Sequence, residues 1–354
     1  MRNVTRELFN IYLSGIAELN GVSKATESFS VDPSIAQVIE TKMQESSDFL
    51  GKINIYPVTE LIGDTVGVVS TGPIASRTNT DTKDRQTADA TGETSRRYKC
   101  EETDYNTHIK WAKLDMWAKF PDFETRIRDV IINQQALDRI MIGWNGTHVA
   151  PESDKVANPL LQDLNIGWLQ SMRLEAPEQV MGSTTVAGAS DAVAGVTTPD
   201  PIKVGPNEEY KNLDAVAMDL TEYLAPWHRE RTDLVVICGR KLLHDKYFPV
   251  VNQTNKPTET LASDIVVSQK RIGGHPAVRV PFFPDNAMLV TTLDNLSIYV
   301  QEQSRRRKVE DNARRKRIEN FESSNDDYIV EDFELAALAE NIEFVEADDA
   351  GAGE

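Results

Sequence analysis

Cysteine is scarce in this sequence, with Cys100 and Cys238 the only two thiols among 354 residues. The two lie far apart and form no Cys-x-x-Cys pair, which excludes a disulfide framework and argues against a cysteine metal site. We expect both to be reduced thiols, in the core or at the surface, of a protein that is made and used in a cytoplasm.

Long apolar runs are also missing. No stretch of eighteen apolar residues occurs, so we expect no membrane span. The apolar residues near the N-terminus are interrupted by Asn10, Ser14 and Glu18, a pattern that a secretory signal would not tolerate.

Recognisable catalytic motifs are absent as well. The histidines lie at least sixteen positions apart, so none forms a closely spaced zinc-binding pair; they are His108, His148, His228, His244 and His275. The sequence has no Walker A loop, GxSxG or GxGxxG motif. Asp326-Asp327 with Glu331-Asp332 could form paired carboxylates, but we interpret them as solvated charge beside strands. We therefore expect no enzyme, no metal site and no cofactor.

Charge is unevenly distributed along the chain. The formal net charge is −18, which argues against general nucleic-acid binding because phosphate contact needs a cationic face. Yet residues 305–317 gather eight cations, namely Arg305, Arg306, Arg307, Lys308, Arg314, Arg315, Lys316 and Arg317. One interpretation is a nucleic-acid-binding arm. We favour contacts between subunits, because Glu310 and Asp311 interrupt the run and like-charged copies need cation–carboxylate pairs to associate.

Hydrophobic periodicity predicts two helices in the N-terminal half. Residues 4–20 place apolar side chains on one helical face, namely Leu8, Tyr12, Ile16 and Leu19, which favours a helix docked on its own domain. Residues 121–146 repeat apolar side chains at three- and four-residue steps and predict a long helix.

Residues 52–111 place strand-like segments around a stretch rich in Thr, Asp and Gly. They predict one long hairpin, which needs a neighbouring layer from another part of this chain or from another copy of it. The alternative interpretation is a disordered insertion in a monomer.

The C-terminal half mixes helices with antiparallel strands. Residues 182–206 are rich in Gly, Ala, Thr and Pro and predict a linker or a surface loop. Helix, strand and helix patterns follow in NLDAVAMDLTEYLAPWH, DLVVICG and RKLLHDKYFPVV, and the Gly273-Gly274 pair predicts a hairpin turn. Because no strand–helix–strand rhythm occurs, we predict the α+β class.

Several stretches together resemble one family. They are MQESSDFL with INIYPV (43–57), NPLLQDLNIGWLQ (158–170), EAPEQVM (175–181), DLVVICGRKLLHDKYFPVVN, SQKRIGGHPAVRVPFFP, LDNLSIYVQEQSRRR and RIENFESSNDDYIVEDF. The chain resembles the major capsid proteins of peduovirus-type temperate phages, which are contractile-tailed phages of Gram-negative bacteria. The resemblance runs from Met1 to about Val345 and departs at residues 72–95, at residues 182–204 and in the acidic tail.

The resemblance implies a Hong Kong 97-type capsid fold. The chain would then be the structural subunit of an icosahedral shell of hexamers and pentamers, enclosing double-stranded DNA that its acidic wall does not bind specifically. The implied segments are an N-terminal scaffold-like extension (1–29), an N-arm (30–51), an E-loop hairpin (52–111), a peripheral domain with a spine helix (112–206), an axial domain (207–290), a return to the peripheral domain (291–345) and an acidic tail (346–354).

The resemblance also implies proteolytic maturation. A phage protease would cut between Phe29 and Ser30, where Phe29-Ser30-Val31-Asp32-Pro33 matches the processing pattern of the family. The implied partners are an internal scaffolding protein, the maturation protease, a portal protein and, where one is present, a decoration protein. The protein would assemble in the host cytoplasm and reside in the virion.

Overall fold

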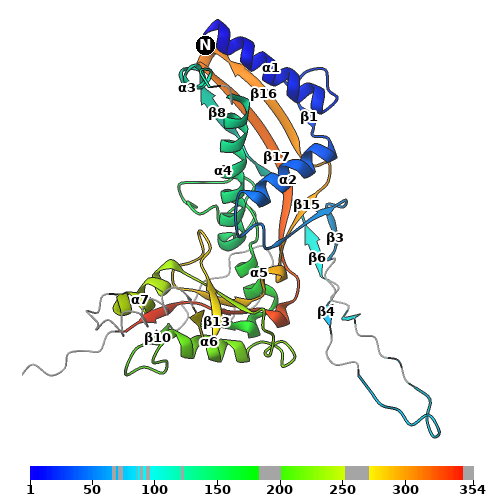
Figure 1. The fold of residues 1–354 in the computed structure, drawn as a ribbon, viewed down its shortest axis with the longest axis vertical. Helices are drawn as coiled ribbons and strands as arrows, with labels where there is room; N and C mark the ends of the chain where they lie inside the picture. The colour runs from blue at the N-terminus through cyan, green and yellow to red at the C-terminus, as the bar shows by residue number, and fades with distance from the viewer. Residues whose placement is uncertain are drawn as a thin grey trace, which may run out of the picture. The chain divides into compact units, whose positions relative to one another are not determined.

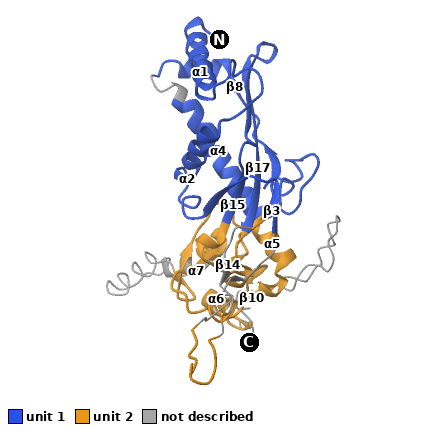
Figure 2. Cartoon of the chain, turned by 90° about the vertical axis from the view of Figure 1, so that its right-hand side faces the viewer, with its two compact units in different colours: residues 1–63, 97–166, 297–329 blue, residues 64–96, 167–296, 330–354 orange. Residues whose placement is uncertain are grey.

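The computed structural model describes residues 1–65, 69–70, 75–85, 87, 91–92, 96–120, 123–182, 201–251 and 271–345. The chain divides into two compact units (Figure 2). Unit 1 combines residues 1–63, 97–166 and 297–329, and unit 2 combines residues 64–96, 167–296 and 330–354. Both units mix helices with sheets, as predicted for the α+β class.

The main sheet of unit 1 has seven strands. Its order is β1-β16-β17-β15-β2, and β7 and β8 also pair with β17. The strands are β1 (Phe29–Ser30), β2 (Asn54–Val58), β7 (Glu101–Asp104), β8 (Thr107–Lys110), β15 (Leu296–Gln301), β16 (Arg306–Asn312) and β17 (Arg317–Val330). β16 and β17 form an antiparallel hairpin in which Arg306 pairs with Ser323 and Asn312 with Arg317. β2 joins β15 in parallel.

The helices described in unit 1 are α1 (Asn3–Leu19), α2 (Pro33–Glu45), α3 (Trp111–Trp117) and α4 (Phe123–Asn145). The sequence sets the start of α2, because the Asp32 side chain accepts a hydrogen bond from the Ser34 backbone N–H at 2.9 Å and Pro33 occupies the first turn. α1 and α4 confirm the helices that periodicity predicts at residues 4–20 and 121–146.

α1 lies along the β16–β17 hairpin (Figure 1) and shares a hydrophobic core with it. Phe9 and Ile16 of the helix and Val309 and Ile318 of the hairpin are buried in this core. The prediction that the helix docks on its own domain is therefore confirmed. The predicted apolar face is only partly right, because Leu19 is 64% exposed.

Unit 2 contains a six-stranded sheet in the order β12-β13-β11-β14-β18-β9. The strands are β9 (Val180–Met181), β11 (Val235–Cys238), β12 (Arg271–Ile272), β13 (His275–Val278), β14 (Met288–Thr291) and β18 (Ala337–Ala339). The described helices of this unit are α5 (Trp168–Glu175), α6 (Leu213–Glu222) and α7 (Arg240–Val251). The predicted order of helix, strand, helix and hairpin is confirmed by α6, β11, α7 and the β12–β13 hairpin. Gly273 and Gly274 form the turn of this hairpin with positive φ values of 58° and 85°, which favour glycine.

The hairpin predicted over residues 52–111 is shorter in the structure. Among the described residues of this stretch, β3 (Ile62–Asp64) pairs with β6 (Arg97–Lys99), and β4 (Val69–Ser70) pairs with β5 (Thr91–Gly92). β2, β7 and β8 instead pair with β15 and β17. Backbone groups that find partners in a larger sheet do not need a local hairpin, so the prediction of one continuous hairpin is wrong.

The linker predicted at residues 182–206 also needs correction. Its end contains β10 (Ile202–Val204), which pairs in parallel with β19 (Ile342–Phe344). Residues 183–200 and the acidic tail, 346–354, lie outside the described residues. The domain boundaries implied by the resemblance stay predictions. None of the described helices is long and apolar enough to cross a membrane.

Candidate functional site

The basic segment, residues 305–317, contains β16 and the short 3₁₀ turn at Ala313–Arg315 and ends at the first residue of β17 (Figure 1). The Asn312 side chain closes this turn by accepting a hydrogen bond from the Arg315 backbone N–H at 3.2 Å. Successive side chains of a strand point to opposite faces of the sheet. The clustered cations therefore meet very different surroundings.

Arg305 precedes β16 and is buried. Its Nε donates to Glu322 at 2.7 Å, and its two terminal nitrogens donate to Glu40 and to Gln135, each at 2.8 Å. A forked guanidinium that satisfies three acceptors joins β17, α2 and α4. Arg305 is therefore engaged within its own chain.

Arg307 is also engaged within the chain. Its Nε donates to the Asn320 side chain at 3.0 Å, and a terminal nitrogen donates to the Tyr12 hydroxyl at 3.0 Å. Because Tyr12 belongs to α1 and Asn320 to β17, Arg307 fastens the N-terminal helix to the hairpin. Two of the eight predicted contact residues, Arg305 and Arg307, thus make contacts within the chain.

The other six cations lie at or near the surface. Two pair with neighbours on their own strands, Lys308 with Glu310 at 2.7 Å and Arg317 with Glu319 at 2.5 Å. Four are exposed, namely Arg306, Arg314, Arg315 and Lys316. Contacts of this segment with other copies stay a prediction. The four exposed cations are the side chains that are free to make them.

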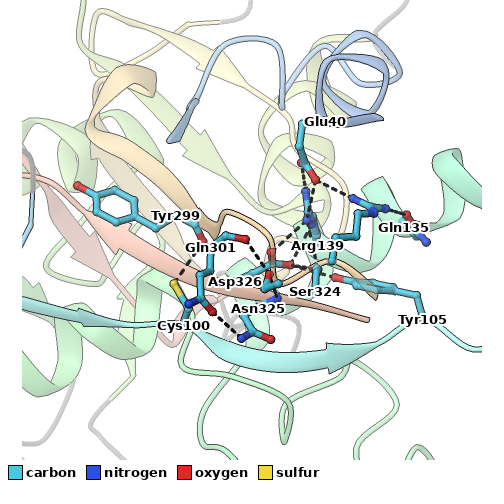
Figure 3. Close-up of polar contacts among 12 residues, drawn as sticks. Glu40, Cys100, Tyr105, Gln135, Arg139, Tyr299, Gln301, Ser324, Asn325 and Asp326 are labelled. Carbon is cyan, nitrogen blue, oxygen red and sulfur yellow. Dashed lines mark hydrogen bonds and ion pairs between the residues drawn. The ribbon is translucent and has the colours of Figure 1, made fainter. Parts of the chain in front are cut away.

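Arg139 of α4 lies at the centre of a buried ionic network (Figure 3). Its guanidinium donates to the two oxygens of Asp326 at 3.2 and 3.1 Å and also pairs with Glu40. Asp326 accepts two further hydrogen bonds, from the Ser324 hydroxyl at 3.1 Å and from the Tyr105 hydroxyl at 3.3 Å. The network therefore connects α2, α4, β17 and the loop before β8.

Glu40 extends this network by accepting hydrogen bonds from both Arg139 and Arg305. Two guanidinium groups thus meet three carboxylates, those of Glu40, Glu322 and Asp326. A buried ion pair is most costly when one partner is removed, because the other charge is then left unpaired in a poorly solvated site. Removal of either arginine is therefore expected to destabilise unit 1.

The pKa values of two buried acids of β17, Asp326 and Glu322, shift in opposite directions. Burial raises the pKa of Asp326, and the nearby Glu40 charge adds to this effect against the opposing Arg139. Burial acts on Glu322 in the same direction, but the charges of Arg305 and Arg307 outweigh it and lower the pKa of Glu322 to about 2. Glu322 is therefore ionised in the folded chain at neutral pH.

The low pKa of Glu322 predicts acid lability. A carboxyl with a folded pKa of about 2, against an ordinary 4.5, stabilises the fold above pH 4.5 and loses that contribution as the pH falls towards 2. The full contribution is about 3 kcal/mol. Unfolding free energies measured between pH 6 and 2.5 should therefore show the deficit of Glu322→Gln shrinking as acid is added. Glu310→Gln, which removes an exposed carboxylate, should show no such convergence.

The interpretation of Asp326-Asp327 as solvated charge is wrong. Both carboxyl groups are buried. Asp327 accepts hydrogen bonds from the backbone N–H groups of Lys99 and Tyr328, at 2.8 and 2.9 Å. Both carboxyl groups are therefore engaged in hydrogen bonds within the fold, an arrangement that stabilises structure.

The two cysteines are buried in the core, one of the two settings predicted for them. Burial raises the pKa of Cys100 to about 12, so this thiol is protonated at neutral pH and is a poor nucleophile. Within the described residues, no three His, Cys, Asp or Glu side chains gather in a way that could hold a metal ion.

The predicted processing site lies in a β-strand. Phe29 and Ser30 form β1, which pairs with Arg307 and Arg306 of β16, and the Phe29 side chain is buried. A protease needs an extended chain that can enter its cleft, so a bond held in a sheet must first be released by local opening. The geometry places this site at the boundary between the docked helix α1 and the rest of unit 1.

Comparison with known proteins agrees with the whole-chain resemblance. The model of the family "Phage major capsid protein, P2 family" matches residues 8–342. The chain is 48% identical to the capsid protein of Escherichia phage P2 over 97% of this chain and 95% of that protein. It is 40% identical to the major capsid protein of Serratia phage KSP20 over 99% of this chain and all of that protein.

Solved structures give the same result for the fold. The chain superposes on a chain of the satellite phage P4 procapsid, which includes the size determination protein, with a TM-score of 0.78 and 45% identity, covering 98% of this chain and 99% of that one. A capsid chain of an empty GTA particle shares the fold at a TM-score of 0.50 and 13% identity, over 84% of this chain and 90% of that one. The chain thus has the Hong Kong 97-type fold and belongs to the P2 family of phage major capsid proteins.

Proposed function

We propose that copies of this chain assemble as hexamers and pentamers into a closed icosahedral shell that encloses double-stranded DNA. The match of nearly the whole chain to a procapsid subunit at a TM-score of 0.78 is the observation that supports this proposal most strongly. The formal net charge of −18 fits a container wall that does not hold its contents by phosphate contacts. It also means that copies repel one another unless local cations pair with carboxylates of a neighbour.

The exposed cations of the hairpin are suited to such contacts. Arg314, Arg315 and Lys316 lie together at the β16–β17 turn, where their side chains are exposed, and Arg306 is exposed on β16. Guanidinium groups bind carboxylates in a bidentate geometry, which fixes orientation as well as adding affinity. We place the inter-subunit contacts of the basic segment at these four residues.

A charge reversal tests this assignment. Arg314→Glu with Arg315→Glu should lower the yield of shells by about tenfold or more, because each reversal turns a cation–carboxylate attraction between copies into a repulsion. The matched control is Arg128→Glu with Lys155→Glu, which makes the same change of net charge at exposed residues outside the hairpin. Electron microscopy and sedimentation of the two preparations measure the yield. Equal yields would remove the hairpin turn from the interface.

Processing between Phe29 and Ser30 is the second part of the proposal. The extension, residues 1–29, folds as α1 and its connection to β1, and a phage protease would remove it during maturation with an internal scaffolding protein present. The support is the match of the sequence around Phe29 to the family's processing pattern and the position of this bond at the end of the docked segment. Portal and decoration proteins complete the expected set of partners.

One experiment addresses both parts. The chain is produced with and without its phage protease, particles are isolated by sedimentation, and their subunits are weighed by intact mass spectrometry. Closed shells, with a subunit mass beginning at Ser30 only when the protease is present, are the expected result. A monomer that stays dispersed at high concentration with its phage partners would contradict the assembly. A different new N-terminus would contradict the processing site alone.

A further inference from the structure

The extension, residues 1–29, is held to the rest of unit 1 by contacts spread along its whole length. Near its start, the backbone N–H of Arg2 donates to Asp115 of α3 at 2.9 Å. At its end, Phe29 pairs with Arg307 in the sheet. A covalent link adds only effective concentration to such contacts, so the contacts themselves remain when the link is cut.

The buried apolar side chains of α1 make the most extensive of these contacts. Phe9 is 3% exposed and Ile16 is 7% exposed. Both lie in the core to which Val309 and Ile318 of the hairpin and Leu114 of α3 contribute (Figure 1). If α1 left this core, apolar side chains on the helix and on the surface beneath it would both meet water, which is unfavourable.

Polar contacts hold the same helix at two further places. The Arg307 guanidinium donates to the Tyr12 hydroxyl at 3.0 Å. Arg6 of the helix pairs with Asp311 of β16 at 3.1 Å. Neither contact depends on the peptide bond at which processing is proposed, so both survive the cut.

The connection between α1 and β1 adds a backbone hydrogen bond to β16. The Ala25 carbonyl accepts from the Val309 N–H at 3.0 Å, and the Ala25 side chain is 2% exposed. Hydrolysis of the bond between Phe29 and Ser30 adds one water across it, leaving a carboxylate on Phe29 and an ammonium group on Ser30. The new carboxylate would lie beside β16, a strand rich in cations, where a negative charge is favoured.

We propose that cutting between Phe29 and Ser30 does not by itself release the extension, and that residues 1–29 stay bound to the chain as a separate peptide. The peptide occupies the α1-binding face, which is formed by Leu114, Ile127, Ile131, Val309 and Ile318. Release is then a second step, in which α1 has to separate from the hairpin. The proposal rests on the proposed function for the place of the cut, whereas retention depends only on contacts within unit 1.

An engineered cut tests retention without the phage protease. A recognition site for a sequence-specific protease is inserted between Ser23 and Lys24, which are both exposed. Complete cutting is verified by mass under denaturing conditions, and the unassembled chain is then passed over gel filtration at about 10 μM. We expect the peptide that carries α1 to elute with the rest of the chain. Uptake of excess labelled peptide of residues 1–23 reports its dissociation, with an expected half-time on the order of an hour or more.

Substitutions in α1 show which contacts hold the peptide. Phe9→Ala should make dissociation at least about a hundredfold faster, because the core loses its aromatic ring. Tyr12→Phe should make it about threefold to tenfold faster, because Arg307 loses an acceptor. This variant keeps the ring, so it tests the proposal even if Phe9→Ala does not fold. The control is Ile11→Ala, at a side chain that is 60% exposed, which should change the rate by less than about twofold.

Two results would overturn the proposal. One is a peptide that separates from the chain as soon as the cut is complete. The other is a dissociation rate that Phe9→Ala and Tyr12→Phe leave unchanged. Shells whose subunits begin at Ser30, together with immediate separation of the engineered peptide, would contradict retention and leave assembly and processing intact. Retention of the engineered peptide, with a phage-protease cut elsewhere than at Ser30, would contradict the processing site alone.

Discussion

Replacing Arg139 by methionine is expected to lower the free energy of unfolding of the unassembled chain by about 3–5 kcal/mol. Methionine fills a similar volume, so the effect comes from charge and not from a cavity. Asp326 would lose its two guanidinium hydrogen bonds and Glu40 one of its two cations, while both carboxylates remain in place. Denaturant titration followed by tryptophan fluorescence measures the change.

The matched control lies on the same helix. Arg128 pairs with Asp129 at 3.2 Å, but its side chain is 52% exposed, so Arg128→Met should cost less than about 0.5 kcal/mol. A second variant separates charge from packing. Arg139→Met combined with Asp326→Asn should be more stable than Arg139→Met alone, because the unpaired charge is gone. If Arg139→Met and Arg128→Met cost the same, the buried network does not stabilise unit 1.

Local patterns predict the helices well because a helix needs only its own residues and one apolar face to be recognised. α4 follows the three- and four-residue repeat from Phe123 to Asn145, and α6 and α7 follow theirs. The Gly273-Gly274 turn is predicted for a similar reason, since two positive φ values favour glycine. Strand partners are different. β2 pairs with β15, more than 200 residues away in sequence, and no local pattern specifies that choice.

Sequence reasoning also misses the buried network, because its members lie far apart in the sequence. Arg305 meets Glu40 and Gln135 only after three separate elements have packed together. The run of cations therefore suggests a surface, although two of its arginines are used inside. One signal was present, because Arg139 lies on the apolar side of α4 between the buried Ala136 and Ile140. A charge at such a position needs a buried partner, and Asp326 could have been sought on that ground.

Replacing Phe9 by alanine is the other change with a large expected effect, a loss of about 3–5 kcal/mol. Phe9 is 3% exposed and packs with Val309 and Ile318 in the core that joins α1 to the hairpin. A small cavity lined by Phe9, Ile109 and other residues already lies at this place, so removing the ring enlarges an existing void. Ile11→Ala, on the exposed side of the same helix, should change the unfolding free energy by less than about 0.5 kcal/mol.

The same substitution tests the proposed processing between Phe29 and Ser30. α1 and β1 share β16, since Tyr12 contacts Arg307 and β1 pairs with Arg306 and Arg307. Loosening α1 should therefore raise the population in which the bond between Phe29 and Ser30 leaves the sheet, and the phage protease should cut Phe9→Ala faster than the parent chain. Intact mass spectrometry over time measures this rate, with Ile11→Ala as the control. A loss of stability without faster cutting would mean that β1 opens independently of α1, and that the docked helix does not protect the bond.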